Sequence, residues 1–192
     1  IKAIPHFEAT LQAAPGGPFA GEALKGLGLA RYETKDLDGA ADTFVRLFKE
    51  APSVALNESA YAWAGQYLFD HEKWSDAALA MRALLEHVKD YPDRSRVRLM
   101  IADCVERAGD LDGALKQYEA IAAEETGQPA VAEARFRIAG IHEQKNDPER
   151  AAALYEEVAL AASNGELGAR AQFRLGELRA GQEKFVEAAR HY

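Results

Sequence analysis

The sequence has a single cysteine, Cys104, among its 192 residues. A disulfide within this chain is therefore excluded, and so is a zinc site built from several cysteine ligands. No apolar run approaches the roughly 18 residues that a membrane-spanning helix needs. Large β-branched residues are sparse, whereas Ala, Leu, Glu and Arg are abundant, a composition that favours helices. This amino-acid composition favours an all-α protein.

The chain also lacks an excess of positive charge, with a net charge of −8 and a pI near 5.2. Because nucleic-acid binding needs a basic face, we expect no nucleic-acid partner. The negative charge serves either solubility or the attraction of a cationic partner. The chain begins with Ile1 and shows no signal peptide, so we expect it to be a piece of a longer protein.

What the sequence does contain is a period of 37 residues. The stretch DLDGA stands at 36–40 and again at 110–114, a separation of 74, which is twice 37. Steps of 37 define an alanine column: Ala3, Ala40, Ala77, Ala114, Ala151 and Ala188. Four residues later stands an aromatic residue or methionine: Phe7, Phe44, Met81, Tyr118, Tyr155 and Tyr192. Twelve residues before the alanine stands a small residue: Gly28, Gly65, Ala102, Ala139 and Gly176. An unbroken period of this length is typical of repeat proteins.

Each unit predicts two antiparallel helices. The first, as at 24–33 or 134–144, has apolar residues at three- and four-residue spacing. A short polar turn follows, with these candidate N-caps for the second helix: Asp36, Ser75, Asp110 and Asp147. The small residues let the two helices pack closely, and the aromatic residue fills the gap toward the next unit. One such pair cannot bury its apolar face alone, so neighbouring units must stack.

These columns resemble the tetratricopeptide repeat family. The first full unit has the family's residues at the family's spacing: Leu24, Leu27, Gly28, Ala40, Phe44, Leu47 and Pro52. The resemblance covers the whole chain and implies a right-handed α-solenoid of antiparallel helix hairpins in one domain, 1–192. It implies a half repeat and five repeats, the last truncated: 1–17, 18–53, 54–92, 93–128, 129–165 and 166–192.

Two features refine this expectation. The unit exceeds the usual length of about 34 residues, and endings such as LLEHVKDYPD at 84–93 are similar to a bacterial envelope subset. That subset includes the Tol-Pal accessory protein and outer-membrane lipoproteins, so we expect the periplasm or cell envelope rather than the cytoplasm. The apolar residues between Phe185 and Tyr192 have nothing after them to cover them. We therefore expect further units in the parent protein, or self-association through this end.

Motifs of catalysis and metal binding are absent from the sequence. The five histidines form no His-Glu-x-x-His pattern, and no nucleophile elbow or phosphate-binding loop occurs. His71 and His142 stand near first-helix ends, where we expect solvated side chains. We therefore expect no enzymatic activity, no metal and no cofactor.

The resemblance implies a groove lined by the first helices, where a partner binds. The family's groove positions give these candidates: Tyr32, Gln66, Phe69, Arg96, Leu99, Asp103, Glu106, Phe136, Glu143 and Phe173. Aromatic anchors combined with charges suit an extended or helical peptide. The column of Leu99, Phe136 and Phe173 is either a binding stripe or partly buried. We expect Trp63 to pack in the core or between repeats, and Trp74 to anchor a turn, rather than to bind a partner.

The hypothesis from the sequence is thus a non-catalytic scaffold for a peptide or protein segment of unknown identity. The alternatives are a self-associating module of a bacterial envelope protein and the regulatory part of a larger enzyme.

Overall fold

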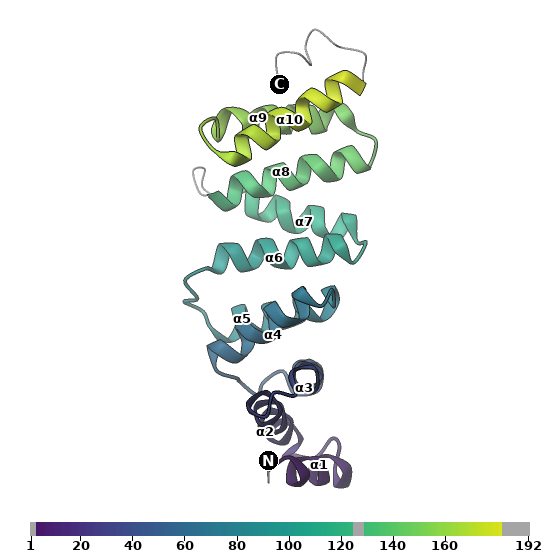
Figure 1. The fold of residues 1–192 in the computed structure, drawn as a ribbon, viewed down its shortest axis with the longest axis vertical. Coiled ribbons are helices and arrows are strands. Elements are labelled where there is room, and N and C mark those ends of the chain that lie inside the picture. The colour runs from purple at the N-terminus through teal and green to yellow at the C-terminus, as the bar shows by residue number, and fades with distance from the viewer. Residues whose placement is uncertain (1–2, 125–128, 182–192) are drawn as a thin grey trace. The chain divides into compact units, whose positions relative to one another are not determined.

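The computed structural model describes residues 3–124 and 129–181, which contain ten helices and no β-strand (Figure 1). The helices are α1 Ile4–Ala13, α2 Ala20–Glu33, α3 Leu37–Glu50, α4 Glu58–Asp70, α5 Trp74–His87, α6 Arg94–Arg107, α7 Leu111–Ala122, α8 Pro129–Gln144, α9 Pro148–Ala161 and α10 Glu166–Gly181. Even-numbered helices correspond to the first helices of the repeats, and odd-numbered helices to the second. The fold is an all-α repeat fold, as the sequence predicted.

The chain divides into two compact units, Ile1–Ala108 and Gly109–Tyr192. The first holds α1 to α6, and the second holds α7 to α10. In the first unit α2 packs on α3, α4 on α5, and α5 on α6. In the second α7 packs on α8, α8 on α9, and α9 on α10. Each unit has its own cluster of buried apolar side chains. The repeat boundaries drawn from the sequence stay a prediction.

The repeating columns lie where helices touch. The alanines Ala40, Ala77, Ala114 and Ala151 are fully buried, and so are Ala102 and Ala139. Gly28 makes room for an aromatic ring, because a Cβ added there would lie 2.4 Å from a ring carbon of Phe44. Gly65 lies in the same way beside Met81, at 3.0 Å, and Gly176 is buried. Ala188 and Tyr192 lie outside the described residues.

The turn between the two helices of a pair repeats a backbone conformation that the sequence analysis did not predict. Positive φ angles recur every 37 residues: Lys35 at 66°, Glu72 at 59°, Gly109 at 91° and Asn146 at 57°. After three of these residues the next amide donates to the carbonyl five residues earlier: Asp36 to Arg31 at 3.0 Å, Lys73 to Leu68 at 2.9 Å and Asp147 to His142 at 2.9 Å. This hydrogen bond is typical of an α-helix that is followed by one residue in the left-handed backbone conformation.

The turn also determines where the second helix begins. Asp36 and Asp110 accept the amides of Gly39 and Gly113 at 3.1 and 2.8 Å, and Asp147 likewise caps α9. The prediction of Ser75 as an N-cap is wrong, because α5 begins at Trp74 and its N-cap is Lys73. The left-handed residue at position 72 fixes the cap one residue later, and Lys73 makes no side-chain cap.

Candidate functional site

A cleft of about 240 Å³ opens between α4 and α6 of the N-terminal unit, and we name it the methionine cleft. Its lining comprises Ala62, Gln66, Met81, Leu84, Tyr91, Asp93, Arg96, Val97 and Met100. Met81, Leu84 and Val97 are buried, whereas Gln66, Asp93 and Arg96 are exposed. The cleft therefore combines an apolar interior with a polar rim.

The cleft has a local cause in the repeat. Position 81 belongs to the column that holds Phe44, Tyr118 and Tyr155 in other repeats, each only 1% exposed. One repeat earlier the space beside Phe44 is also a cleft, of about 110 Å³, so a methionine at this position accompanies the larger opening. The sequence contains two methionines in all, and both of them, Met81 and Met100, line this cleft. The repeat pattern predicted a packing role for Met81, and the rarity of methionine is the signal that points to the cleft.

A second cleft of about 110 Å³ lies on the other side of α4, and we name it the aromatic cleft. It is lined by Leu29, Tyr32, Phe44, Asn57, Ser59, Ala60 and Trp63. The rings of Tyr32 and Trp63 meet edge to face with centroids 4.7 Å apart, and Tyr32 is 38% exposed. Trp63 also packs on Phe44 and Tyr67, so it has both a packing contact and a surface in the cleft.

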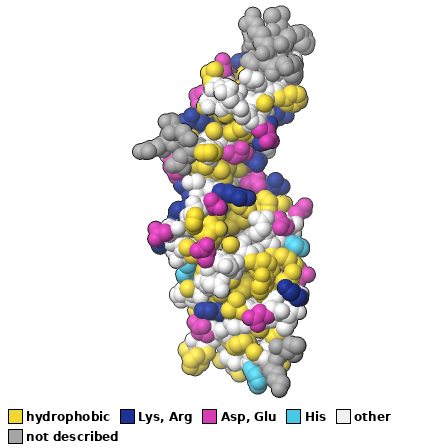
Figure 2. All heavy atoms as spheres, turned by 60° about the vertical axis from the view of Figure 1, so that its left-hand side comes forward, with side chains coloured by type: hydrophobic (Ala, Val, Ile, Leu, Met, Phe, Trp, Pro, Cys, Tyr) yellow, Lys and Arg dark blue, Asp and Glu magenta, His cyan; other side chains and the backbone are white. Residues whose placement is uncertain are grey.

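One face of the N-terminal unit is rich in apolar side chains. On the face drawn in Figure 2, apolar side chains gather over the lower part, which belongs to the N-terminal unit, and charged side chains lie around them.

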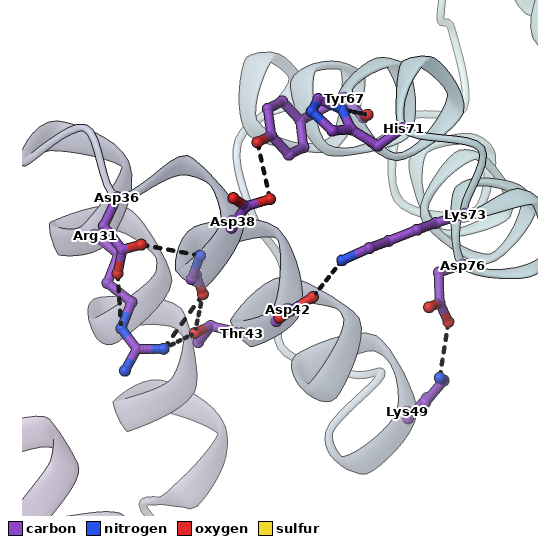
Figure 3. A network of polar contacts seen from close by, with 11 residues as sticks. Arg31, Asp36, Asp38, Asp42, Thr43, Lys49, Tyr67, His71, Lys73 and Asp76 are labelled. Carbon is purple, nitrogen blue, oxygen red and sulfur yellow. Dashed lines mark hydrogen bonds and ion pairs between the residues drawn. The ribbon is translucent and has the colours of Figure 1, made fainter.

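Polar contacts hold α3 against the following helix pair (Figure 3). The Tyr67 hydroxyl donates to Asp38 at 3.1 Å, and the Lys73 ammonium donates to Asp42 at 2.9 Å. Lys49 and Asp76 form a further pair at 2.8 Å. The hydrogen bond to Asp42 raises the pKa of Lys73. Of these contacts, the one between Tyr67 and Asp38 joins α4 to α3, which both line the aromatic cleft.

Three of the predicted groove residues line the clefts: Tyr32 the aromatic cleft, and Gln66 and Arg96 the methionine cleft. Phe69 does not. Its ring packs edge to face on Trp74 at 5.2 Å, and the guanidinium of Arg107 lies 5.6 Å from it. Trp74 is the first residue of α5 and lies under the same guanidinium, so this cluster anchors the turn.

The remaining candidates of α6 line neither cleft. Leu99 and Glu106 are half-buried. Asp103 pairs with Arg107 at 2.9 Å, and its side chain is only 14% exposed.

The candidates in the C-terminal unit differ from one another in exposure. Phe136 packs edge to face on Tyr155 at 5.2 Å, beneath the guanidinium of Arg170. Glu143 accepts hydrogen bonds from the Tyr155 hydroxyl and from Arg174. Burial raises the pKa of that hydroxyl. Phe173, by contrast, is 52% exposed.

The described residues contain no group of three or more His, Cys, Asp or Glu side chains that could hold a metal ion. His71 is exposed, as expected, but His142 is not solvated. Its side chain is 14% exposed, and its Nδ1 lies 3.7 Å from a carboxylate oxygen of Asp147. Within the described ranges, no helix has the length and apolar character needed to cross a membrane.

Comparisons with known proteins agree with the repeat pattern. The family model described as Tetratricopeptide repeat matches residues 2–55, 64–129 and 106–166. No curated protein sequence matches the chain significantly.

Solved structures share the fold at low identity. The crystal structure of MamA has 16% identity and a TM-score of 0.61, covering 86% of this chain and 90% of its own. YrrB, described as a TPR protein with an unusual peptide-binding site, has 14% identity and a TM-score of 0.57, covering 96% and 88%. PcrH, solved with the chaperone-binding region of PopD, has 22% identity and a TM-score of 0.54, covering 67% and 97%. At these identities the likeness concerns the fold alone. With its unbroken period, its helix pairs and a family model matching most of its length, this chain belongs to the tetratricopeptide repeat family.

Proposed function

We propose that this chain is a non-catalytic scaffold that binds a peptide segment of another protein on the face formed by its first helices. The observation that carries the proposal is the pair of clefts on the two sides of α4. Ser59, Ala60 and Trp63 of this helix line the aromatic cleft, whereas Ala62 and Gln66 line the methionine cleft. An extended segment crossing α4 would thus find two places for its side chains.

The size of the clefts favours a peptide over a small molecule. Pockets for small-molecule ligands measure about 300–1,000 Å³, whereas these clefts measure about 240 and 110 Å³. Each accommodates one side chain. The relatives with peptide complexes or peptide-binding sites in their descriptions, PcrH and YrrB, support the same class of function.

The test is selection from a displayed library of random peptides, followed by affinity measurement by fluorescence anisotropy. Replacing Tyr32 or Gln66 with Ala should weaken the selected peptides about tenfold, the usual loss at an interface anchor. Gln12→Ala is the matched control, because Gln12 is exposed on α1 and lines neither cleft. Peptides that bind equally well to all three variants would place the binding face elsewhere and contradict the proposal.

The finer predictions from the sequence extend this proposal and need their own tests. The structures compared above do not support a Tol-Pal-like subtype. A periplasmic or envelope location is testable by fractionating cells that carry the tagged full-length gene. Recovery in the cytoplasmic fraction would contradict it. Self-association through the C-terminal end concerns residues outside those described, and sedimentation over a concentration range tests it.

A further inference from the structure

We propose that the methionine cleft binds an aliphatic side chain of a partner segment that carries one carboxylate close to that side chain. This inference rests on the proposed function and specifies the chemistry of the partner. It is carried by the residues that form the interior of the cleft and by the charges on its rim.

The interior is suited to a flexible apolar guest. Both methionines of the chain line it, and their unbranched thioether side chains adapt to apolar groups of different shape. Leu84 and Val97 complete an apolar surface with them. Met81 stands where other repeats have an aromatic ring, and this cleft is larger than the cleft beside Phe44 one repeat earlier. A leucine or methionine side chain of a partner would bury its apolar surface there.

The rim of the cleft favours a negatively charged group in the partner. Arg96 is the one cation among the lining residues, it is exposed, and its guanidinium has no ion pair with another described residue. Neighbouring arginines are occupied, since Arg94 donates to the Leu85 carbonyl at 3.1 Å and Arg107 pairs with Asp103. A guanidinium pairs with a carboxylate through two parallel hydrogen bonds.

The opposite charge on the rim limits how many acids the partner can carry. Asp93 stands at the N-cap of α6, where the helix dipole stabilises a carboxylate. It would repel a second acid of the partner. The rim therefore favours one acidic residue beside the apolar anchor, rather than a run of acids.

The two methionines allow peptide binding in the cleft to be observed directly by NMR. Protein labelled with ¹³C at the methionine methyl groups gives two signals, and both report on this cleft. The probes are capped synthetic peptides of serine and glycine with one leucine and one glutamate, the glutamate placed one to four residues before or after the leucine. At least one peptide should shift both signals saturably. The same peptide with serine for leucine, or glutamine for glutamate, should bind about tenfold more weakly.

Two variants test the assignment from the protein side. Arg96→Glu should favour peptides with lysine in place of glutamate, whereas Arg82→Glu, an exposed change on α5 outside the cleft, should not alter the preference. Met81→Phe should narrow the cleft and weaken binding, because the cleft beside Phe44 is the smaller of the two. We expect it to fold, because Gly65 leaves beside position 81 the space that Gly28 leaves for Phe44. Its far-UV circular dichroism and melting temperature check this.

Each outcome separates this inference from the general proposal. Equal binding of the glutamate and glutamine peptides, or equal effects of Arg96→Glu and Arg82→Glu, would overturn the role of Arg96. If no peptide moves either methionine signal, while library-selected peptides shift the Trp63 indole signal and depend on Tyr32, the inference fails and the scaffold stands. If no selected peptide depends on Tyr32 or Gln66, the proposed function itself fails.

Discussion

One residue in each described turn between paired helices has a left-handed backbone conformation, which is unfavourable for residues other than glycine. Lys35, Glu72 and Asn146 hold positive φ, and Gly109 is the one glycine at this repeated position among the described turns. A side chain with a Cβ pays about 1–2 kcal/mol for left-handed backbone. The left-handed conformation therefore recurs despite this cost, and glycine adopts it without strain at one repeat.

Replacing Gly109 with Ala should destabilise the C-terminal unit by about 1 kcal/mol. Nothing lies within 4 Å of a Cβ added there, so the effect would come from the φ of 91° alone. Gly16→Ala is the control, since its added Cβ also meets open space and its φ lies outside the left-handed range. Urea unfolding followed by circular dichroism measures both, and equal midpoints would contradict the prediction.

Cys104 is a second residue whose behaviour depends on burial. Its side chain is fully buried, and burial, helped by the charge of Asp103, raises the pKa of the thiol from 9.0 to about 11. The thiolate, not the thiol, is the nucleophile that attacks a labelling reagent. At about pH 8 the native protein should therefore resist labelling by a thiol reagent and react fully in denaturing urea. Rapid labelling of the native protein would contradict the burial.

The same shift makes stability depend on pH. Between pH 9 and about 11 the unfolded thiol has lost its proton, whereas the folded thiol retains it. The unfolded state then binds fewer protons, so the stability present below pH 9 declines as pH rises toward 11. Cys104→Ala should show a smaller decline over this range in urea titrations at each pH. Identical pH profiles would rule out the linkage.

At the scale of helices, the column of small residues determines how closely a pair can pack. Ala114 of α7 is fully buried, whereas Ala120 of the same helix is exposed. The two alanines have the same chemistry and differ only in the face that they occupy, so they form a matched pair.

Ala114→Leu should overpack this buried site and cost about 1–3 kcal/mol. Ala120→Leu should change stability by less than about 0.5 kcal/mol, because an exposed helix position tolerates leucine. The melting temperatures of the two variants test the difference. An unchanged melting temperature for Ala114→Leu would mean that the helices have room at this column.

At the scale of the whole molecule, the chain has two compact units with separate apolar clusters. Stability in repeat proteins is built from neighbouring contacts, so all-or-none unfolding is not required. Both tryptophans, Trp63 and Trp74, lie in the N-terminal unit.

Tryptophan fluorescence should thus follow the N-terminal unit alone, whereas far-UV circular dichroism follows all helices. We expect the two urea transitions to have different midpoints. Coincident transitions over the whole range would show that the chain unfolds as one cooperative body.

The helices themselves were largely predictable from the sequence. The 37-residue period predicted the helix pairs α2–α3, α4–α5 and α8–α9, and the caps at Asp36, Asp110 and Asp147 follow from local hydrogen bonding. The cap of α5 was not predictable from Ser75, because the left-handed turn residue fixes the helix start and lysine gives no capping signal.

The sequence by itself determined the repeat, the helix pairs and the small residues at their contacts, because these depend on the spacing of residues along one helix. Only the tertiary structure decided which side chains line an opening. Phe69 and Gln66 are neighbours on α4, yet Phe69 packs on Trp74 whereas Gln66 lines the methionine cleft. That cleft needs side chains from three helices at once, and its volume depends on the space that Met81 leaves between them. Whether a side chain is buried or lines a cleft depends on the helices packed around it. The residue pattern of one helix therefore does not determine it.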